Sequence, residues 1–297
     1  TQGVSSAASD VYKRQKIMRM NCVTTYIRQS LHHIYPPGEL RSLTKMICCD
    51  LLGQDAIDYY LGKDIILSAN EQRDLESIVE RLKKNEPIQY IQGRANFYGS
   101  MFRVAPGVLI PRPETEELVD LIVKESATGV RLLDIGTGSG CIAISLSKHI
   151  PGAEVTAWDV SENALAIARQ NNQELKTKVN FEKVDVFSTE FSGDRRYDII
   201  VSNPPYVTES EKNEMEPNVL DWEPGLALFV PDNDPLLFYR RIASLGREML
   251  SLHGKLYFEI NRAYGEEVLQ MLGGKGYRDL RLIKDISGND RIVTAKR

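Results

Sequence analysis

Apolar residues recur at helical spacing in the first third of the chain. Between residues 21 and 85 they lie three and four positions apart in three segments, which predicts amphipathic helices over residues 22–35, 38–52 and 71–85. The segment Pro36-Pro37-Gly38 separates the first two helices, and Ser68 with Glu71 has the spacing of a capping box before the third. This pattern predicts a small helical bundle over residues 18–86.

Residues 87–112 have a different pattern. Aromatic and β-branched residues alternate there with Gly and Pro, which predicts a short β-hairpin rather than a helix. We expect this hairpin to link the bundle to the domain that follows.

Short apolar runs then alternate with helical periodicity as far as the last residue. The runs predict strands over residues 130–136, 153–160, 179–186, 197–203 and 254–260, and a final strand pair over 279–285 and 291–297. Helices are predicted over residues 141–150, 161–175, 235–250 and 264–274. The alternation predicts an α/β fold, a Rossmann-like doubly wound and mostly parallel sheet within a domain over residues 113–297. Ligands of such a sheet bind at the carboxyl ends of its strands.

Composition and charge narrow the classes of function. The 297 residues have a formal net charge of −4, which disfavours a direct nucleic-acid partner because phosphate neutralisation needs a concentrated basic face. No run approaches the roughly 18 apolar residues of a membrane helix and no signal peptide is evident, so we expect a cytoplasmic protein with no membrane partner. The four cysteines form no CxxC pair, and no metal site is predicted. Residues 1–17 are polar and aperiodic, and we interpret them as a disordered or non-native leader.

The first predicted strand of the sheet ends in a glycine-rich loop. The segment Gly136, Thr137, Gly138, Ser139 and Gly140 lets the backbone turn sharply and approach a ligand at the start of the next helix. A GxGxG match by itself is equally compatible with a dinucleotide, a nucleoside or no ligand.

The ends of the next two strands carry groups that suit an adenosine ligand. Asp159 closes the second strand, where its carboxylate can accept hydrogen bonds from both ribose hydroxyls. The alternative is that Asp159 only helps to start the following helix, although Ser161 already provides a cap. Asp185 and Val186 follow the third strand, where Asp185 can accept from an adenine amine and Val186 can pack on the ring.

The fourth strand runs directly into Asn203-Pro204-Pro205-Tyr206. A planar nitrogen is a poor nucleophile because its lone pair is delocalised, so catalysis has to make that lone pair available. The Asn203 side-chain oxygen and the Pro204 carbonyl can accept the two N–H hydrogens, the prolines restrain the backbone, and Tyr206 can stack on the flat group. Alone, this segment is equally compatible with a loop that ends a strand. After the glycine loop and the acidic second strand, it favours methyl transfer from a sulfonium donor.

Six segments together resemble one family. The ordered set VLIPRPETEELV, LLDIGTGSGCIAISL, DVSENALAIARQN, VSNPPYV, WEPGLALF and DISGNDRIV is similar to that of the HemK/PrmC family, the bacterial release factor glutamine methyltransferases. The resemblance extends from about residue 21 to the last residue. It implies a helical N-terminal domain that docks the substrate, a hairpin linker and a class I methyltransferase domain. It also implies an enzyme that uses S-adenosyl-L-methionine to methylate the glutamine of the GGQ motif in class I peptide chain release factors. We expect a monomer.

The resemblance also implies roles for particular residues. Cofactor contacts are expected from the loop Gly136 to Gly140, from Asp159, from Asp185 and Val186, and from Asn203. The substrate glutamine is expected to be held by Asn203, Pro204, Pro205 and Tyr206, which are also the catalytic residues. Arg112, in the IPRPETE stretch, is expected to have a structural or gating role. Residues 259–265 read EINRAYG where the family usually has EIGxxQG, so Asn261 and Tyr264 replace the small and the amide residue of the family pattern.

Three alternatives remain open from the sequence. A sister enzyme that methylates a glutamine in a ribosomal protein would use the same active-site chemistry. An adenine-amine DNA methyltransferase would also use Asn-Pro-Pro-Tyr, but it needs a target-recognition region and a basic groove. A nucleoside-binding protein without catalysis would reuse the fold alone.

Overall fold

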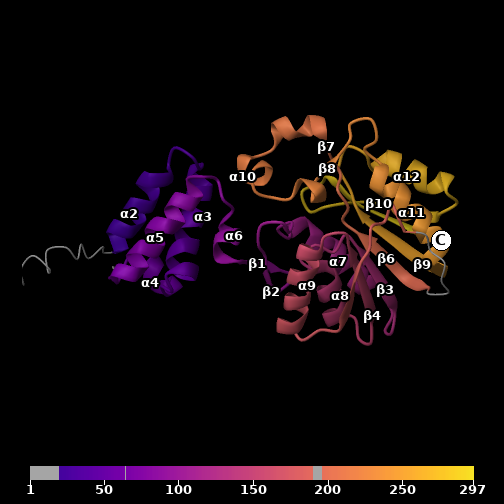
Figure 1. The fold of residues 1–297 in the computed structure, drawn as a ribbon, viewed down its shortest axis with the longest axis horizontal. Coiled ribbons are helices and arrows are strands. Elements are labelled where there is room, and N and C mark those ends of the chain that lie inside the picture. The colour runs from indigo at the N-terminus through magenta and orange to yellow at the C-terminus, as the bar shows by residue number, and fades with distance from the viewer. Residues whose placement is uncertain (1–19, 64, 190–195) are drawn as a thin grey trace, which may run out of the picture. The chain divides into compact units, whose positions relative to one another are not determined.

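The computed structural model describes residues 20–63, 65–189 and 196–297, so the predicted leader at residues 1–17 lies outside the described residues (Figure 1). The chain divides into a smaller unit that ends at Gln92 and a larger unit over Gly93–Arg297. None of the helices in these ranges is long and apolar enough to cross a bilayer. The same ranges contain no cluster of three or more His, Cys, Asp or Glu side chains arranged to hold a metal ion.

The smaller unit is helical, as predicted. Its elements are α2 (Met20–Leu31), α3 (Pro37–Lys45), the π-helix η1 (Met46–Leu51), α4 (Ala56–Tyr60), α5 (Ala69–Leu82) and α6 (Ile88–Gln92). Apolar residues from α2, α3 and α5, among them Ile27, Leu43 and Leu75, form one buried cluster. The predicted capping box of α5 is present, because Ser68 Oγ accepts from the Glu71 N–H and the Glu71 carboxylate accepts from the Ser68 N–H.

Two details of this unit differ from the prediction. The second helix changes from α to π at Met46, where the Leu52 N–H reaches the Ile47 carbonyl five residues back at 2.9 Å. The helices α4 and α6 were not predicted, because five residues are too few to show a helical period. The helix α6 lies within the segment that was predicted as part of the hairpin linker.

The hairpin itself begins the larger unit. Strands β1 (Arg94–Phe97) and β2 (Ser100–Arg103) pair in antiparallel fashion. Tyr98 and Gly99 both have positive φ in the turn between them, the conformation that matches the twist of a two-residue hairpin. Phe97 and Phe102 are fully buried and pack edge to face at 5.9 Å between ring centres.

The larger unit is built on the predicted mixed sheet. Its strands are β3 (Arg131–Ile135), β4 (Glu154–Asp159), β5 (Val179–Lys183), β6 (Tyr197–Ser202), β9 (Leu250–Glu259), β10 (Arg278–Lys284) and β11 (Asp290–Lys296). Their order is β10-β11-β9-β6-β3-β4-β5. The five strands from β9 to β5 are parallel, and β11 and β10 add the antiparallel pair at one edge.

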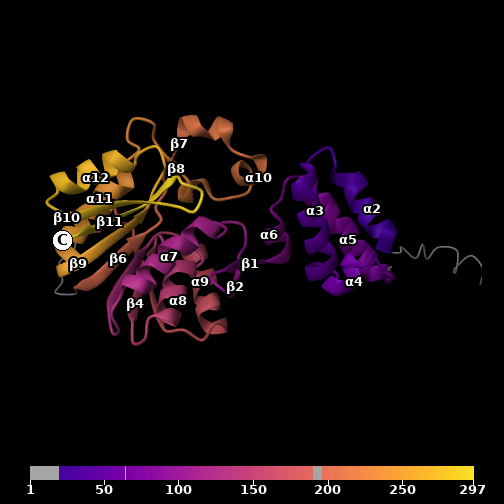
Figure 2. The same cartoon turned by 180° about the vertical axis from the view of Figure 1, so that it is seen from behind.

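Helices cover both faces of this sheet (Figures 1 and 2). One face carries α7 (Pro113–Glu125), α8 (Cys141–His149) and α9 (Glu162–Glu174), and the other carries α11 (Leu237–Met249) and α12 (Gly265–Gly274). Neighbouring residues of one strand therefore enter different cores: Leu133 packs with the α11 and α12 side, whereas Leu132 packs with the α7 and α8 side. This two-residue period explains why the central strands are apolar on both faces.

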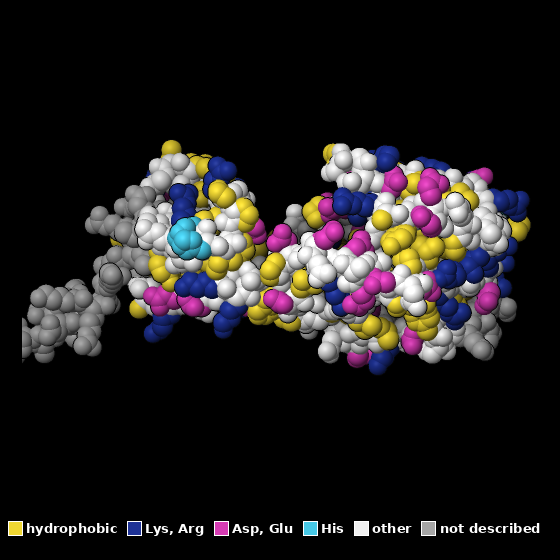
Figure 3. All heavy atoms as spheres, turned by 90° about the horizontal axis from the view of Figure 1, so that it is seen from above, with side chains coloured by type: hydrophobic (Ala, Val, Ile, Leu, Met, Phe, Trp, Pro, Cys, Tyr) yellow, Lys and Arg dark blue, Asp and Glu magenta, His cyan; other side chains and the backbone are white. Residues whose placement is uncertain are grey.

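The segment between β6 and α11 contains short elements that were not predicted. They are β7 (Val207–Thr208), η2 (Glu209–Glu214), α10 (Pro217–Leu220), η3 (Gly225–Ala227) and β8 (Phe229–Val230). The two strands pair in parallel as a separate two-stranded sheet. On the face of the larger unit that Figure 3 shows, Lys and Arg side chains are interspersed with Asp and Glu.

Candidate active site

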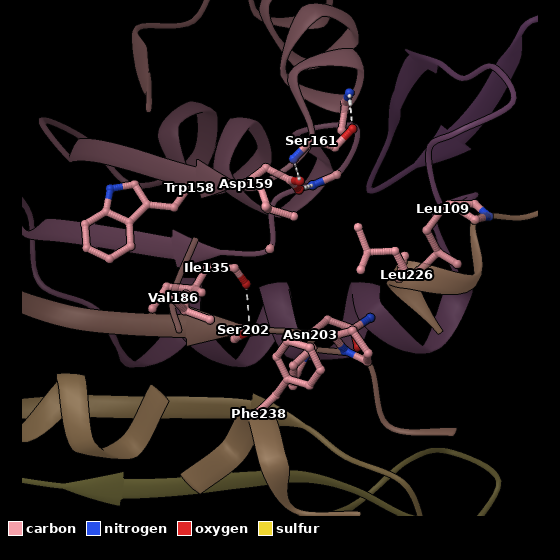
Figure 4. A pocket seen from close by; sticks show the side chains of 18 of the residues that line it. Leu109, Ile135, Trp158, Asp159, Ser161, Val186, Ser202, Asn203, Leu226 and Phe238 are labelled. Atoms are coloured by element: carbon pink, nitrogen blue, oxygen red, sulfur yellow. Dashed lines mark hydrogen bonds between the residues drawn. The ribbon is translucent and has the colours of Figure 1, made fainter. Parts of the chain in front are cut away.

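A cavity of about 510 Å³ lies at the carboxyl ends of the parallel strands (Figure 4). Eight of the residues that we predicted as site residues line it: Gly136, Gly138, Asp159, Asp185, Val186, Asn203, Pro204 and Pro205. The other four, Thr137, Ser139, Gly140 and Tyr206, are not part of the lining. Strand order explains this convergence, because β3, β4, β5 and β6 are neighbours whose ends meet at one edge.

The glycine-rich loop between β3 and α8 has its glycines in the left-handed region. Gly136 and Gly138 have φ of +77° and +55°, and both border the cavity. Gly140 has φ of +82° but faces the helices: a Cβ there would lie 2.9 Å from Ile144 Cδ1 and 3.2 Å from Ala168 Cβ. The absence of a side chain at Gly140 therefore lets α8 and α9 approach each other.

Thr137 and Ser139, the two polar residues of the loop, are buried. Thr137 Oγ1 donates to Asp134 Oδ2 at 2.7 Å, and the Ser139 carbonyl accepts from Asn171 Nδ2 at 2.9 Å. Asp134 is fully buried, and this burial raises the pKa of its carboxyl to about 7, although the Thr137 hydrogen bond acts in the other direction. These contacts fix the shape of the loop from below.

Asp159 connects the second strand to the glycine loop. Its Oδ2 accepts from the Gly138 N–H at 2.8 Å and its Oδ1 accepts from the Ser161 N–H at 2.9 Å (Figure 4). Ser161 is the predicted cap of α9, with its Oγ accepting from the Ala164 N–H at 3.3 Å. Burial raises the pKa of the Asp159 carboxyl, and the backbone N–H donors lower it. Asp159 thus helps to start the helix and also borders the cavity.

One end of the cavity is apolar. Ile135, Trp158 and Val186 line it (Figure 4). Phe238 from α11 also lines the cavity, and Figure 4 draws its ring beside Asn203. Strand β5 ends at Lys183 rather than at residue 186 as predicted, because the Asp185 carboxylate accepts from the Phe187 N–H at 2.9 Å and turns the chain. The Val186 carbonyl accepts from Arg241 Nε at 2.5 Å, which ties this loop to α11.

The segment Asn203 to Tyr206 leaves β6 at the other end of the cavity. Asn203 Nδ2 lies 3.4 Å from Thr115 Oγ1, and the Tyr206 hydroxyl donates to Glu259 Oε1 at 3.1 Å. Burial and the nearby Glu259 carboxylate raise the pKa of Tyr206. The Tyr206 carbonyl accepts from Asn261 Nδ2 at 3.1 Å, so the Asn that departs from the family pattern holds the backbone of this segment.

Glu259, the last residue of β9, is buried beneath this segment. Its side chain accepts from the Thr115 hydroxyl at 2.6 Å as well as from Tyr206. Only 1% of Glu259 is exposed, and burial raises the pKa of its carboxyl while the two hydroxyl donors and Arg291 lower it. One carboxylate thus touches two of the chain segments that form this end of the site.

An ion pair between Arg112 and a buried Glu223 connects two segments beside the cavity, with 33% of the Arg112 side chain exposed. Arg112 Nη2 lies 2.5 Å from Glu223 Oε1, and Glu223 Oε2 accepts from the Ile110 N–H at 3.1 Å. Leu109 is adjacent to Ile110 in the sequence, and Leu226 lies three residues after Glu223. Both lie on the same side of the cavity (Figure 4). A structural or gating role was expected for Arg112, and this ion pair is a structural contact.

Comparisons with known proteins agree with this architecture. Residues 24–93 match the family model of the PrmC N-terminal domain, and residues 114–219 match that of the methyltransferase small domain. The chain is 68% identical to the release factor glutamine methyltransferase of Bacteroides thetaiotaomicron, covering 94% of this chain and 100% of the relative. It is 44% identical to the enzyme of the same name from Flavobacterium psychrophilum, covering 91% of this chain and 96% of the relative.

The chain belongs to the release factor glutamine methyltransferases. The predicted family and the class I methyltransferase fold are therefore confirmed, and the protein is a methyltransferase of the S-adenosyl-L-methionine-dependent class. A solved methyltransferase from Pyrococcus furiosus has the same fold, with a TM-score of 0.51 at 17% identity over 77% of this chain and 98% of that chain.

Three residues of the site were not among the predicted site residues. Thr115, Glu223 and Glu259 are each buried in the described part of the chain, and each contacts a segment that borders the cavity. Glu259 had a signal in the sequence, because an acidic residue that ends an apolar strand lies at the same sheet edge as the predicted ligand. Thr115 and Glu223 lie in two of the segments that carry the family resemblance, but nothing in the sequence indicated their contacts, since their partners are more than 80 residues away.

Proposed function

We propose that this enzyme transfers a methyl group from S-adenosyl-L-methionine to the side-chain amide nitrogen of the glutamine in the GGQ motif of class I peptide chain release factors. The observation that carries the proposal is the position of Asn203. Its amide borders a cavity whose other end is apolar, and it follows a parallel strand next to the glycine loop. The relatives named above share this activity in their names.

The residues around the cavity fit the proposed cofactor. Ile135, Trp158 and Val186 provide an apolar slot for a flat ring, and Asp159 provides a carboxylate for ribose hydroxyls. Gly136 and Gly138 allow a ligand to approach the backbone closely, because nothing lies within 4 Å of a Cβ at Gly136 and only Val108 lies that near at Gly138. Asp185, at the end of the apolar slot, is the candidate for contact with the adenine amine.

The bound cofactor supplies an electrophilic methyl group. The work of the protein is then to orient the glutamine amide so that the nitrogen lone pair faces that methyl group. Asn203 Oδ1 and the Pro204 carbonyl accept the two N–H hydrogens, which restrains the amide and favours the form with developing positive charge on nitrogen. Pro204 and Pro205 restrict the backbone that carries the second acceptor.

Tyr206 has a supporting part in this proposal. Its hydroxyl donates to Glu259, which fixes the ring at the end of the segment. Tyr206 is not part of the cavity lining, so stacking of its ring on the substrate amide stays a prediction. The proton that the methylated nitrogen carries in excess leaves afterwards, so no strong base is needed at the reacting atom.

The helical unit, with residues 18–86, is the part that docks the release factor. Ile57, Tyr60, Leu61 and Ile66 are between 67% and 71% exposed there, an unusual number of large apolar side chains for one short segment. Residues 87–112 form the linker, residues 113–297 hold the catalytic site, and the enzyme acts as a cytoplasmic monomer. The interspersed charges of Figure 3 give a duplex no continuous basic face on that side.

The decisive experiment follows labelled methyl from S-adenosyl-L-methionine to three acceptors in parallel. These are a release factor, the same factor with its GGQ glutamine replaced by alanine, and duplex DNA. Label on the first alone is the expected result. Label on DNA overturns the proposal, and label on none of them, while a ribosomal protein accepts it, identifies the sister activity instead.

A further inference from the structure

The end of the cavity at Asn203 contains a chain of hydrogen bonds with a defined direction. Glu259 Oε2 accepts from Thr115 Oγ1 at 2.6 Å, and Thr115 Oγ1 lies 3.4 Å from Asn203 Nδ2. Thr115 and Glu259 are 2% and 1% exposed, so water does not compete for these groups. These hydrogen bonds connect the first turn of α7, the end of β6 and the end of β9.

The direction of this chain follows from the number of protons available. An ionised carboxylate only accepts, and a threonine hydroxyl has one proton to donate. Because Thr115 donates that proton to Glu259, its oxygen can act only as an acceptor toward Asn203. The Asn203 amide therefore turns its NH₂ group toward Thr115, since the opposite orientation would bring two acceptor oxygens together.

Burial raises the pKa of Glu259 and opposes its ionisation, but the geometry around its two oxygens is that of an acceptor. Two hydroxyl groups, from Thr115 and Tyr206, converge on its two oxygens, and the Arg291 guanidinium contributes a favourable charge. Glu114, on the first turn of α7, opposes this effect. A neutral carboxyl would have to donate its own proton to one of these hydroxyls and would break the direction of the chain.

We infer that Thr115 and Glu259 are positioning residues for methyl transfer, which orient the Asn203 amide so that Oδ1 faces the substrate amide. This inference rests on the proposed function, in which Asn203 Oδ1 accepts a substrate N–H. Thr115 and Glu259 contact neither substrate nor cofactor: neither lines the cavity. Glu259 also restrains Tyr206, so one buried carboxylate aligns both polar side chains of the segment Asn203 to Tyr206.

The test compares Thr115→Val with Thr115→Ser in the full-length enzyme. Val matches Thr in shape but lacks the hydroxyl, so kcat is expected to fall at least about 10-fold, with KM for S-adenosyl-L-methionine within about three-fold of wild type. Ser retains the hydroxyl, and its kcat is expected to stay within about three-fold. Thr294→Val, which removes another buried threonine hydroxyl in the larger unit, serves as the matched control and leaves both constants unchanged.

A double-mutant cycle tests whether the two residues act in one chain. Glu259→Gln replaces one acceptor oxygen with a donor, and kcat is expected to fall at least as far as in Thr115→Val. The double variant should then lose no more than Glu259→Gln alone, because the chain is already broken. Fully multiplicative losses overturn the inference, as does a Thr115→Val enzyme that keeps the wild-type kcat or a Thr115→Ser enzyme that is impaired as much as Thr115→Val.

A second measurement does not depend on the substrate. In a sample labelled with ¹⁵N-asparagine, the side-chain amide signal of Asn203, assigned with Asn203→Asp, is expected to shift in Thr115→Val and to stay in place in Thr115→Ser. An unchanged signal in Thr115→Val overturns the inference. A wild-type enzyme that fails to methylate the release factor overturns the proposed function, while this signal still decides whether the chain of hydrogen bonds orients Asn203.

Discussion

Two buried carboxylates support the cavity, one near the glycine loop and one near the segment Asn203 to Tyr206. Asp134 accepts from Thr137 at 2.7 Å, and Glu259 accepts from Thr115 at 2.6 Å. Burial raises the pKa of both carboxyl groups. Both contacts are hydrogen bonds from a threonine hydroxyl to a carboxylate. The two partners are close in the sequence in the first contact and far apart in the second.

The difference lies in the distance along the chain. Asp134 lies near the end of β3 and Thr137 lies three residues later in the loop before α8, so that contact shapes a loop that forms locally. Glu259 and Thr115 are 144 residues apart, and their contact requires α7 and β9 to be packed in place. The cofactor end is thus a local motif, whereas the reacting end is assembled from distant elements. Changes at the two ends should therefore separate cofactor binding from turnover.

Asn203→Ala is the strongest test of this separation. The substrate amide loses an acceptor at the reacting nitrogen, so we expect kcat to fall by roughly 10²–10³-fold, the usual loss when one preorganised hydrogen-bonding group at a reacting centre is removed. Binding of S-adenosyl-L-homocysteine, measured by calorimetry, should stay within a few-fold, because the contacts at the glycine loop remain. Undiminished turnover in this variant would falsify the role of Asn203.

Asp134→Asn probes the carboxylate at the cofactor end through its pH dependence. The folded-state pKa of about 7 lies above the ordinary 3.8, so the neutral form stabilises the fold at low pH and this contribution is lost as the pH rises toward 7. Between pH 5 and pH 8 we expect the wild-type free energy of unfolding to lose roughly 2–3 kcal/mol from this group, a loss that Asp134→Asn lacks. Denaturant titrations of both proteins at the two pH values measure the difference. Parallel pH profiles would show that Asp134 titrates normally.

Much of the fold and part of the site could be predicted from the sequence because they depend on local patterns. The strand and helix periods are local, and a parallel sheet brings the carboxyl ends of its strands together whatever the loops between them do. Gly136, Asp159 and Asn203 each follow an apolar strand, and the structure places all three around one cavity. Family resemblance added the nature of the substrate, which no single segment indicates.

The remaining features could not be predicted because they depend on contacts between distant segments. Nothing near Thr115 in the sequence indicates that its hydroxyl meets Glu259, and nothing near Arg112 indicates its ion pair with Glu223. Gly140 fits the glycine motif in sequence, yet its φ and its neighbours on α9 become evident only in three dimensions. Short elements such as β7 are too brief for any period to show.

Asp159→Ala should affect the cofactor end alone. If two ribose contacts are lost, binding of S-adenosyl-L-homocysteine is expected to weaken by about 1–3 kcal/mol, while kcat at saturating cofactor stays close to wild type. The variant also loses the bonds to the Gly138 and Ser161 N–H groups, so Ser161→Ala, which removes only the helix cap, is the control for loss of stability. Calorimetry on both variants separates the two effects, and native affinity in Asp159→Ala would remove this carboxylate from the ribose.

Gly136→Ala and Gly140→Ala form a matched pair of substitutions, and the difference between them is the smallest effect that we predict. Both residues have positive φ, so each substitution is expected to cost roughly 1–2 kcal/mol of backbone strain. Only Gly140→Ala adds a clash, with Ile144 Cδ1 and Ala168 Cβ, and it should lower the free energy of unfolding by about 1 kcal/mol more than Gly136→Ala. Gly136→Ala, whose methyl group is added beside the cavity, should weaken cofactor binding more. If the two variants change the free energy of unfolding and the cofactor affinity equally, the loop acts as one unit. Gly136 and Gly140 would then not have separate roles in cofactor binding and helix packing.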